Sequence, residues 1–258
     1  MLAAGIDVGS TSGEVVILDG DTMLAYSIVD IGYNSRRAAD LALEHALGER
    51  GLTREQIGAM VATGYGRIAI DYAEKQATEI SCYARGVHFL YPQVRTVIDI
   101  GGQDSKVISV SAKGKPSDFQ MNDKCAAGTG RFLEVMARAL QLELTELGAI
   151  SARAKNQVVV SSMCTVFAES EVITLVAEGT SREDIVAGLH RAIAKRVGAM
   201  VKRVGVVPPI AFAGGVAKNA GVARALEQEL GESLLIPDEP QIIGALGAAL
   251  VARDGEGS

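Results

Sequence analysis

Tryptophan is absent from this sequence, and aromatic residues make up only 4% of its 258 residues. The hydrophobic fraction is nevertheless 48%, so alanine, valine, isoleucine and leucine must fill the core. Glycine is frequent, with 29 residues. An aliphatic core combined with many tight strand-to-helix turns is typical of α/β proteins, and this composition predicts one.

Basic residues are not in excess: the formal net charge is −6, so nothing in the composition requires a nucleic acid or an anionic membrane as partner. No stretch approaches the roughly 18–20 apolar residues that span a bilayer. The first residues also lack the basic segment of a signal peptide. We therefore expect a cytoplasmic protein, in which three cysteines argue against a disulfide framework.

The opening of the chain follows a strand–turn–strand pattern that recurs near Pro92. Residues 2–8 form an apolar run that ends in Asp7-Val8-Gly9, and strands are expected to follow at 15–18 and 23–29. Residues 96–100 repeat the scheme with Asp99-Ile100-Gly101, and residues 107–110 return as the next strand. The repeat predicts two related lobes: residues 1–94, with a C-terminal helix at about 241–252 packing back onto them, and residues 95–240.

The remaining elements are expected from apolar periodicity. Further strands are expected at 59–63, 119–121, 210–213 and 234–236, and helices at 36–47, 78–90, 131–140, 166–177, 181–204, 218–230 and 242–252. Thr180 with Glu183 is the pattern of a capping box at the start of the 181–204 helix.

Three glycine-rich turns follow predicted strands, at residues 7–12, 99–104 and 213–219. In the first two, backbone N–H groups and hydroxyls could wrap phosphates while Asp7 faces a hydrated Mg²⁺. The third opens a helix, where missing side chains let a nucleoside or phosphate come close. Each turn alone could serve geometry only, but three in order around a repeat predict a nucleotide site.

No Gly-Lys-Ser/Thr run is present, so a Walker-type phosphate loop is excluded. The arrangement of turns and repeat instead resembles the two-lobed ATPases that include actin, hexokinase and the heat-shock chaperone ATPases. The resemblance implies their ribonuclease H-like α/β fold.

Two of the three cysteines, Cys125 and Cys164, each precede a predicted helix. A helix N-terminus lowers the pKa of a thiol, so both positions suit thiolates bound to a metal cluster. A cubane cluster usually needs four thiolates, which a two-fold dimer would supply. The alternative is two ordinary cysteines at helix starts. Cys82 lies within a predicted helix and is expected to be a small buried residue.

Six segments together resemble a known family over nearly the whole chain, from Gly5 to Ala252: residues 5–11, 62–67, 97–104, 121–131, 161–171 and 214–219. The two cysteine segments, Met121–Arg131 and Ser161–Glu171, are the most specific. The family is that of the activators of 2-hydroxyacyl-CoA dehydratases. It also includes ATPase subunits of benzoyl-CoA reductase and reductases of double-cubane cluster proteins.

The resemblance implies a homodimer that holds one oxygen-sensitive 4Fe–4S cluster through Cys125 and Cys164 of each protomer, with the dimer interface on the second lobe. A ferredoxin or flavodoxin would supply the electron. ATP hydrolysis would change the angle between the cluster-flanking helices and drive the electron into an iron–sulfur dehydratase or reductase.

The resemblance also assigns the nucleotide site. Mg²⁺ would lie near Asp7 and Asp104, which with Gln103 would be catalytic. ATP or ADP would contact Gly9, Ser10, Thr11, Ser12, Gly13, Glu14, Gly102, Gln103, Gly214, Gly215, Val216, Asn219 and Gln241. Glu14 departs from the family, whose members often carry Lys or Arg there. Its carboxylate would repel phosphate, so either it points away or the backbone alone serves at that position.

Two other functions fit the same fold. A small-molecule kinase would need a catalytic aspartate and a substrate cleft, usually built from inserted subdomains for which 258 residues leave little room. A nucleotide-gated regulatory protein without a cluster is the third possibility. Both leave the cysteine segments unexplained.

Overall fold

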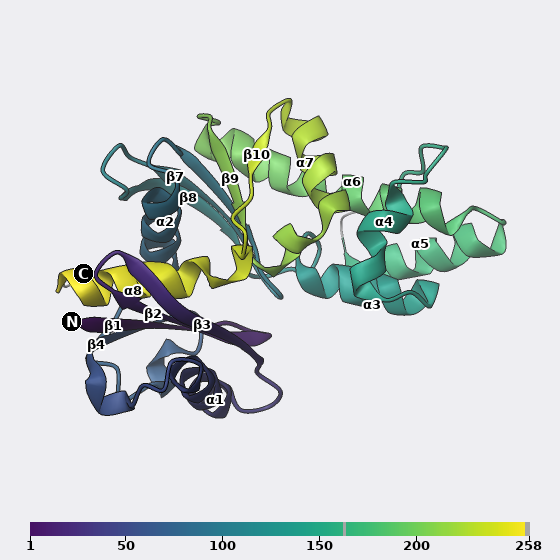
Figure 1. Ribbon diagram of the computed structural model, residues 1–258. Helices are drawn as coiled ribbons and strands as arrows, with labels where there is room; N and C mark the ends of the chain where they lie inside the picture. Colours follow the sequence, from purple (N-terminus) through teal and green to yellow (C-terminus); the bar gives the residue numbers. More distant parts are fainter. Residues whose placement is uncertain (162–163, 256–258) are drawn as a thin grey trace. The chain divides into compact units, whose positions relative to one another are not determined.

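The computed structural model describes residues 1–161 and 164–255. Ser162 and Met163, which belong to the second cysteine segment, therefore lie outside the described residues. The chain divides into two compact units (Figure 1). Unit 1 contains Met1–Val97, Ile108–Ser117 and the described residues from Pro237 onward, and unit 2 contains Ile98–Val107 and Asp118–Ile236.

Unit 1 is built on a mixed five-stranded sheet with the order β3-β2-β1-β4-β5. Antiparallel pairs join β1, β2 and β3, whereas β1–β4 and β4–β5 are parallel. The strands are β1 (Leu2–Val8), β2 (Ser12–Asp19), β3 (Thr22–Asp30), β4 (Ile57–Thr63) and β5 (Lys75–Gln76), and the helices are α1 (Ser35–Gly48), α2 (Glu79–Leu90) and α8 (Ile243–Asp254), with short 3-10 turns at Arg54–Gln56, Arg67–Ala69 and Pro240–Ile242.

Helices cover both faces of this sheet, α1 on one and α8 on the other, which is why β1 is apolar and buried along nearly its whole length (Figure 1). Ile6 and Val15 pack toward α1, and Ala3 packs with Ala248 of α8. Small residues let α8 approach closely. A side chain at Gly5 would overlap the backbone of α8, and one at Gly247 would overlap the backbone of Cys82 in α2.

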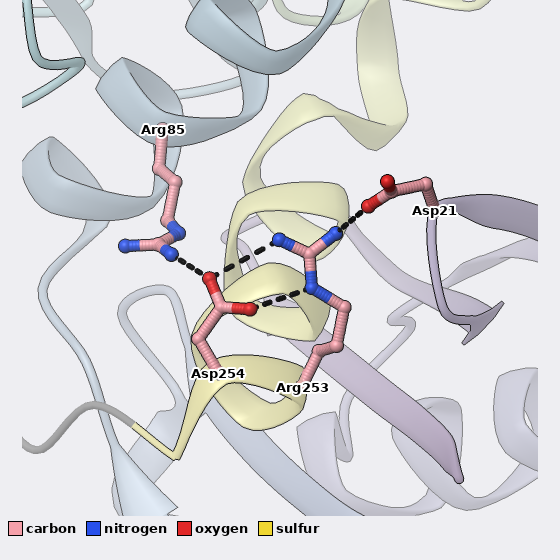
Figure 2. Close-up of polar contacts among 4 residues, drawn as sticks. All are labelled: Asp21, Arg85, Arg253 and Asp254. Atoms are coloured by element: carbon pink, nitrogen blue, oxygen red, sulfur yellow. Dashed lines mark hydrogen bonds and ion pairs between the residues drawn. The ribbon is translucent and has the colours of Figure 1, made fainter.

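An ion-pair network anchors the end of α8 within unit 1 (Figure 2). Arg85 of α2 pairs with Asp254, and Arg253 pairs with Asp21 in the β2–β3 turn. Arg253 also donates to Asp254, from Nε to Oδ1 at 2.6 Å. The four side chains are partly or largely exposed, so we expect a modest contribution to stability.

The second five-stranded sheet has the order β10-β9-β6-β7-β8. Its strands are β6 (Thr96–Ile100), β7 (Ser105–Val110), β8 (Pro116–Asn122), β9 (Ile210–Ala213) and β10 (Leu234–Leu235). Unit 2 adds the helices α3 (Gly130–Leu140), α4 (Leu147–Ser151), α5 (Thr165–Ala177), α6 (Arg182–Val204) and α7 (Ala220–Leu230), with 3-10 turns at Leu144–Glu146 and Gly215–Lys218.

The long helix α6 supplies the apolar stripe expected from the sequence. Ile185, Leu189, Ile193 and Val197 are buried in one core with Phe132, which lies on α3. The α/β class is therefore confirmed, as is the order of its main strands and helices. Among the described residues, no helix is long and apolar enough to cross a membrane.

Two local expectations were wrong. The N-cap of α6 is Ser181, whose hydroxyl accepts from the amide of Asp184, and not Thr180. The helix expected at 218–230 begins at Ala220, because Gly215–Lys218 first forms a 3-10 turn and Asn219 caps α7. In both places a neighbouring polar residue has the extended backbone that a cap requires.

Candidate functional site

The first glycine turn joins β1 to β2, and its aspartate is held in a cradle of glycines. The amide of Gly9 donates to the carbonyl of Ser12 at 3.0 Å, which closes the turn. Asp7 is only 5% exposed. A side chain at Gly64 or at Gly244 would overlap the Asp7 carboxylate, so these glycines define where that carboxylate lies.

Glu14 turns inward from the first turn. It is 4% exposed and lies opposite Asp7 in the β1–β2 ladder. Its Oε1 accepts from Nε2 of Gln241 at 3.0 Å, and the same nitrogen donates to Oγ of Ser12 at 2.9 Å. Three residues expected at the nucleotide are thus brought together within unit 1, although Gln241 comes from the far end of the chain.

The second turn, Asp99–Asp104, is built like the first. The amide of Gly101 donates to the carbonyl of Asp104, again at 3.0 Å. The glycines that follow β4 and β9 also correspond: Gly64 has φ +86° and Gly214 has φ +84°. A side chain at Gly64 would overlap Asp7, and one at Gly214 would overlap Asp99. The internal repeat read from the sequence is therefore present in the structure.

A buried lysine just after the second turn, on β7, was missed by the sequence analysis. Lys106, 3% exposed, places its ammonium 3.0 Å from Oδ2 of Asp99 and 2.7 Å from Oδ2 of Asp104. A lysine at the start of the returning strand, two residues after Asp104, was the available signal. One cation thus holds two carboxylates of the turn in place, while Gln103 beside them is exposed.

The third turn, Gly214–Asn219, is held by hydrogen bonds inside unit 2. Asn219 caps α7, because its Oδ1 accepts from the amides of Gly221 and Val222. Its Nδ2 lies 3.3 Å from Nε2 of the buried His190. Gly215 is exposed, whereas the side chain of Val216 packs in the core.

The second turn is also bonded to the helix that follows the first cysteine segment. The amides of Gly130 and Arg131, at the start of α3, donate to the carbonyls of Gly101 and Gly102 at 2.9 and 2.7 Å. These amides belong to the first helical turn, which has no intrahelical partners for them. The second turn and the start of α3 are therefore joined by backbone hydrogen bonds.

The cysteine segments differ from each other. Cys164 is the N-cap residue of α5, as expected. The helix after Cys125 is confirmed, since α3 begins at Gly130, within one residue of the expected start. Cys125 does not lie at its N-terminus as expected, because a tight turn from Ala126 to Thr129 intervenes and Thr129 is the N-cap. Glycine and threonine at the end of the segment favour a turn and a cap over an earlier helix start.

Both cysteines are half-buried, and no disulfide forms among the three cysteines, all of which are described. Asn122 donates to the carbonyl of Cys125 at 2.8 Å, which fixes the segment to the end of β8. Cys82 is fully buried in α2, and burial raises the pKa of its thiol to about 12, so its expected structural role is confirmed. Within the described residues of one chain, no three His, Cys, Asp or Glu residues form a group that could hold a metal ion.

Comparisons with known proteins agree with the expectation of a nucleotide-binding protein. The sequence pattern of the BadF/BadG/BcrA/BcrD ATPase family matches residues 4–252. The chain is 49% identical to the 2-hydroxyisocaproyl-CoA dehydratase activator of Clostridioides difficile over 255 residues, which cover 98% of this chain and 96% of that protein.

Solved structures show the same fold. The activator of the 2-hydroxyisocaproyl-CoA dehydratase from Clostridium difficile with bound ADPNP superposes with a TM-score of 0.94 at 48% identity, covering 99% of this chain and 95% of that one. A ROK hexokinase from Thermus thermophilus matches with a TM-score of 0.55 at 18% identity, covering 99% of each chain. The second match concerns the fold alone, and it confirms the hexokinase-like architecture expected from the sequence.

Proposed function

Because the chain belongs to the BadF/BadG/BcrA/BcrD ATPase family, we propose that it is an ATP-driven electron carrier that activates a 2-hydroxyacyl-CoA dehydratase. In this proposal it works in the cytoplasm as a homodimer with one 4Fe–4S cluster, accepts an electron from a ferredoxin or flavodoxin, and passes it to an iron–sulfur partner. The names of the similar activators favour a dehydratase as that partner.

Two observations together carry the proposal. Cys125 and Cys164 are half-buried thiols, and backbone hydrogen bonds join the second glycine turn to the helix that follows Cys125. The amides at the start of α3 bind the carbonyls of Gly101 and Gly102, and the Cys125 segment leads directly into α3. A nucleotide bound or hydrolysed at the second turn would therefore act on the segment that holds Cys125. A kinase would have no use for this connection.

The donor set of one chain fits half of a cubane cluster. Thiolates are the usual ligands of iron–sulfur clusters, and two chains related by a two-fold axis would bring four. When bound, the cluster would store and release one electron. The protein's part is to hold Cys125 through the Asn122 bond and to place Cys164 at the positive end of α5.

The surface of α5, the helix that Cys164 caps, supports the proposed dimer. The apolar side chains of Val166, Phe167, Ile173 and Val176 on α5 are 47–69% exposed. Exposed apolar side chains gathered on one helix mark an interaction surface more often than a solvated one. A second copy of the chain would cover this surface and bring its own Cys125 and Cys164 to the same place.

At the nucleotide, we assign roles to the three turns as the sequence analysis expected. The first and second turns would hold the phosphates, with Asp7, Gln103 and Asp104 around Mg²⁺ and the attacking water. The third would contact the nucleoside. The glycine cradle of Asp7 and the buried Lys106 support this assignment, because both hold carboxylates in defined positions near the turns.

Anaerobic purification tests the cluster. We expect about four irons and four sulfides per dimer, with cluster absorption in the visible range. Cys125→Ser and Cys164→Ser should each lose this iron, whereas the matched variant Cys82→Ser should keep it. A colourless, iron-free dimer with full ATPase activity would contradict the proposal, and so would equal iron loss in all three variants.

The dimer is tested separately by Phe167→Glu, with Tyr33→Glu, an exposed aromatic of the β3–α1 loop, as control. We expect sedimentation velocity to show monomers for the first variant and dimers for the second. A dimeric Phe167→Glu protein would remove α5 from the proposed interface.

A further inference from the structure

Glu14 makes contacts that its charge alone does not explain. Its carboxylate is buried at the first phosphate turn, where an anion should repel the phosphates of a nucleotide. It accepts from Nε2 of Gln241 at 3.0 Å, and that nitrogen also donates to Oγ of Ser12 at 2.9 Å. The three side chains thus form a short relay: Glu14, Gln241, Ser12.

The chemistry of the groups sets the direction of this relay. An ionised carboxylate only accepts hydrogen bonds, so the Gln241 atom that faces Glu14 must be its nitrogen. The amide nitrogen has two hydrogens, and here one goes to Glu14 and the other to Ser12. The Ser12 oxygen therefore accepts within the relay, which leaves its own hydrogen to be donated elsewhere.

We infer that Glu14 is a positioning residue that makes the Ser12 hydroxyl a hydrogen-bond donor toward the phosphates of the bound nucleotide. The inference rests on the proposed function, in which the first turn holds those phosphates. Ser12 is the first residue of β2, directly after the turn that Gly9 closes. A hydrogen-bond donor at this place stabilises a phosphate oxygen. The negative charge of Glu14 is directed at the amide of Gln241 and not at the phosphate.

The register of the sheet supports this reading of Glu14. Glu14 lies opposite Asp7 in the β1–β2 ladder, so both side chains stand on the face that α8 covers. Gln241 enters that face from the 3-10 turn Pro240–Ile242 just before α8. The relay therefore also ties the C-terminal segment of the chain to the phosphate turn.

The experiment compares binding of ATP and of adenosine, measured by calorimetry on the anaerobically purified full-length protein. Glu14→Leu removes the acceptor, Ser12→Ala removes the donor, and Glu14→Leu/Ser12→Ala removes both. Glu14→Gln keeps an acceptor oxygen without the charge and is the conservative rescue. Glu44→Leu, an exposed glutamate of α1, is the matched control.

We expect Glu14→Leu to weaken ATP binding by about ten- to hundredfold, as for the loss of a hydrogen bond to a charged group, and to leave adenosine binding unchanged. Ser12→Ala should lose about as much ATP affinity. The double variant should lose little more, because both substitutions abolish the same hydrogen bond from Ser12 to the phosphate. Glu14→Gln should recover most of the affinity that Glu14→Leu loses.

Three outcomes would overturn the inference: unchanged ATP affinity in Glu14→Leu, additive losses in the double variant, or equal losses for ATP and adenosine. If Glu14→Leu does not fold, Gln241→Leu breaks the same relay and is judged by the same criteria. Failure of the unmodified protein to bind ATP would instead refute the proposed function, so the two failures are distinguishable.

Discussion

Acidification from pH 8 to pH 5 is expected to destabilise the protein through His190, which α6 buries against the start of α7. The ring is 1% exposed, and its Nε2 faces Nδ2 of Asn219 at 3.3 Å. Because Oδ1 of Asn219 is occupied by the cap of α7, its nitrogen is the atom that meets the ring. The ring must therefore accept at Nε2, which requires the neutral form with its hydrogen on Nδ1.

The magnitude follows from the pKa of this ring. Burial first, and then the charges of Arg224 and Arg191, lower the pKa of His190 to about 3. In the unfolded chain the pKa is about 6.5. As the pH falls below about 6.5, only the unfolded state takes up a proton, so the free energy of unfolding decreases until about pH 3. At pH 5 the loss is about 2 kcal/mol relative to pH 8.

The assay is urea unfolding at pH 8, 7, 6 and 5 under anaerobic conditions, on the natural protein and on His190→Gln. Glutamine does not titrate but can still accept from Asn219. The remaining histidines, His45 and His88, are present in both proteins, so the comparison isolates the effect of His190. We expect the stability advantage of the natural protein over His190→Gln to shrink by about 2 kcal/mol from pH 8 to pH 5. Parallel pH profiles would refute the reasoning.

Three further substitutions test the packing and the charges. Lys106→Met should cost about 3–5 kcal/mol of unfolding free energy, because it leaves two carboxylates facing each other without their cation, and a loss below about 1 kcal/mol would contradict the buried ion pair. Gly244→Ala should lower the free energy of unfolding by about 1–3 kcal/mol and reduce ATPase activity, because the added methyl group displaces Asp7. Gly48→Ala is the control: its methyl group, at the end of α1, would touch no other atom, so stability should stay the same or rise slightly. Arg253→Ala should change stability by less than about 1 kcal/mol, since its ion pairs are partly exposed (Figure 2); a larger thermal shift would show that the network matters more than its exposure suggests.

The helix caps show where reading the sequence reached its limit. The sequence predicts a capping box from Thr180 and Glu183, whereas the structure caps α6 one residue later, through the Ser181 hydroxyl that accepts from the amide of Asp184. Cys125 stands before a helix in the sequence, but a turn from Ala126 to Thr129 follows it, and the last residue of that turn is the cap. Such shifts depend on which residue takes the extended backbone, and that is settled by the packing of the whole segment.

The buried charges show a deeper limit. Glu14 was recognised as unusual for a phosphate turn, yet its partner could not be named, because Gln241 lies 227 residues further along the chain. Lys106 was overlooked, although it follows the second turn by two residues and its ammonium pairs with both aspartates of that turn. A pattern of residue types does not state which of several nearby acids and bases will share one buried site.

By itself, the sequence determined the α/β class, the repeated Asp-x-Gly turns, the apolar stripe of α6 and the burial of Cys82. These features follow from local periodicity and from backbone shapes that glycine alone adopts easily. Only the tertiary structure decided that Glu14 meets Gln241 and Ser12, that Asn219 meets His190, and that the second turn is bonded to α3. The physical reason is that a buried polar group must find a partner wherever the fold brings one, and the distance along the chain does not restrict that choice.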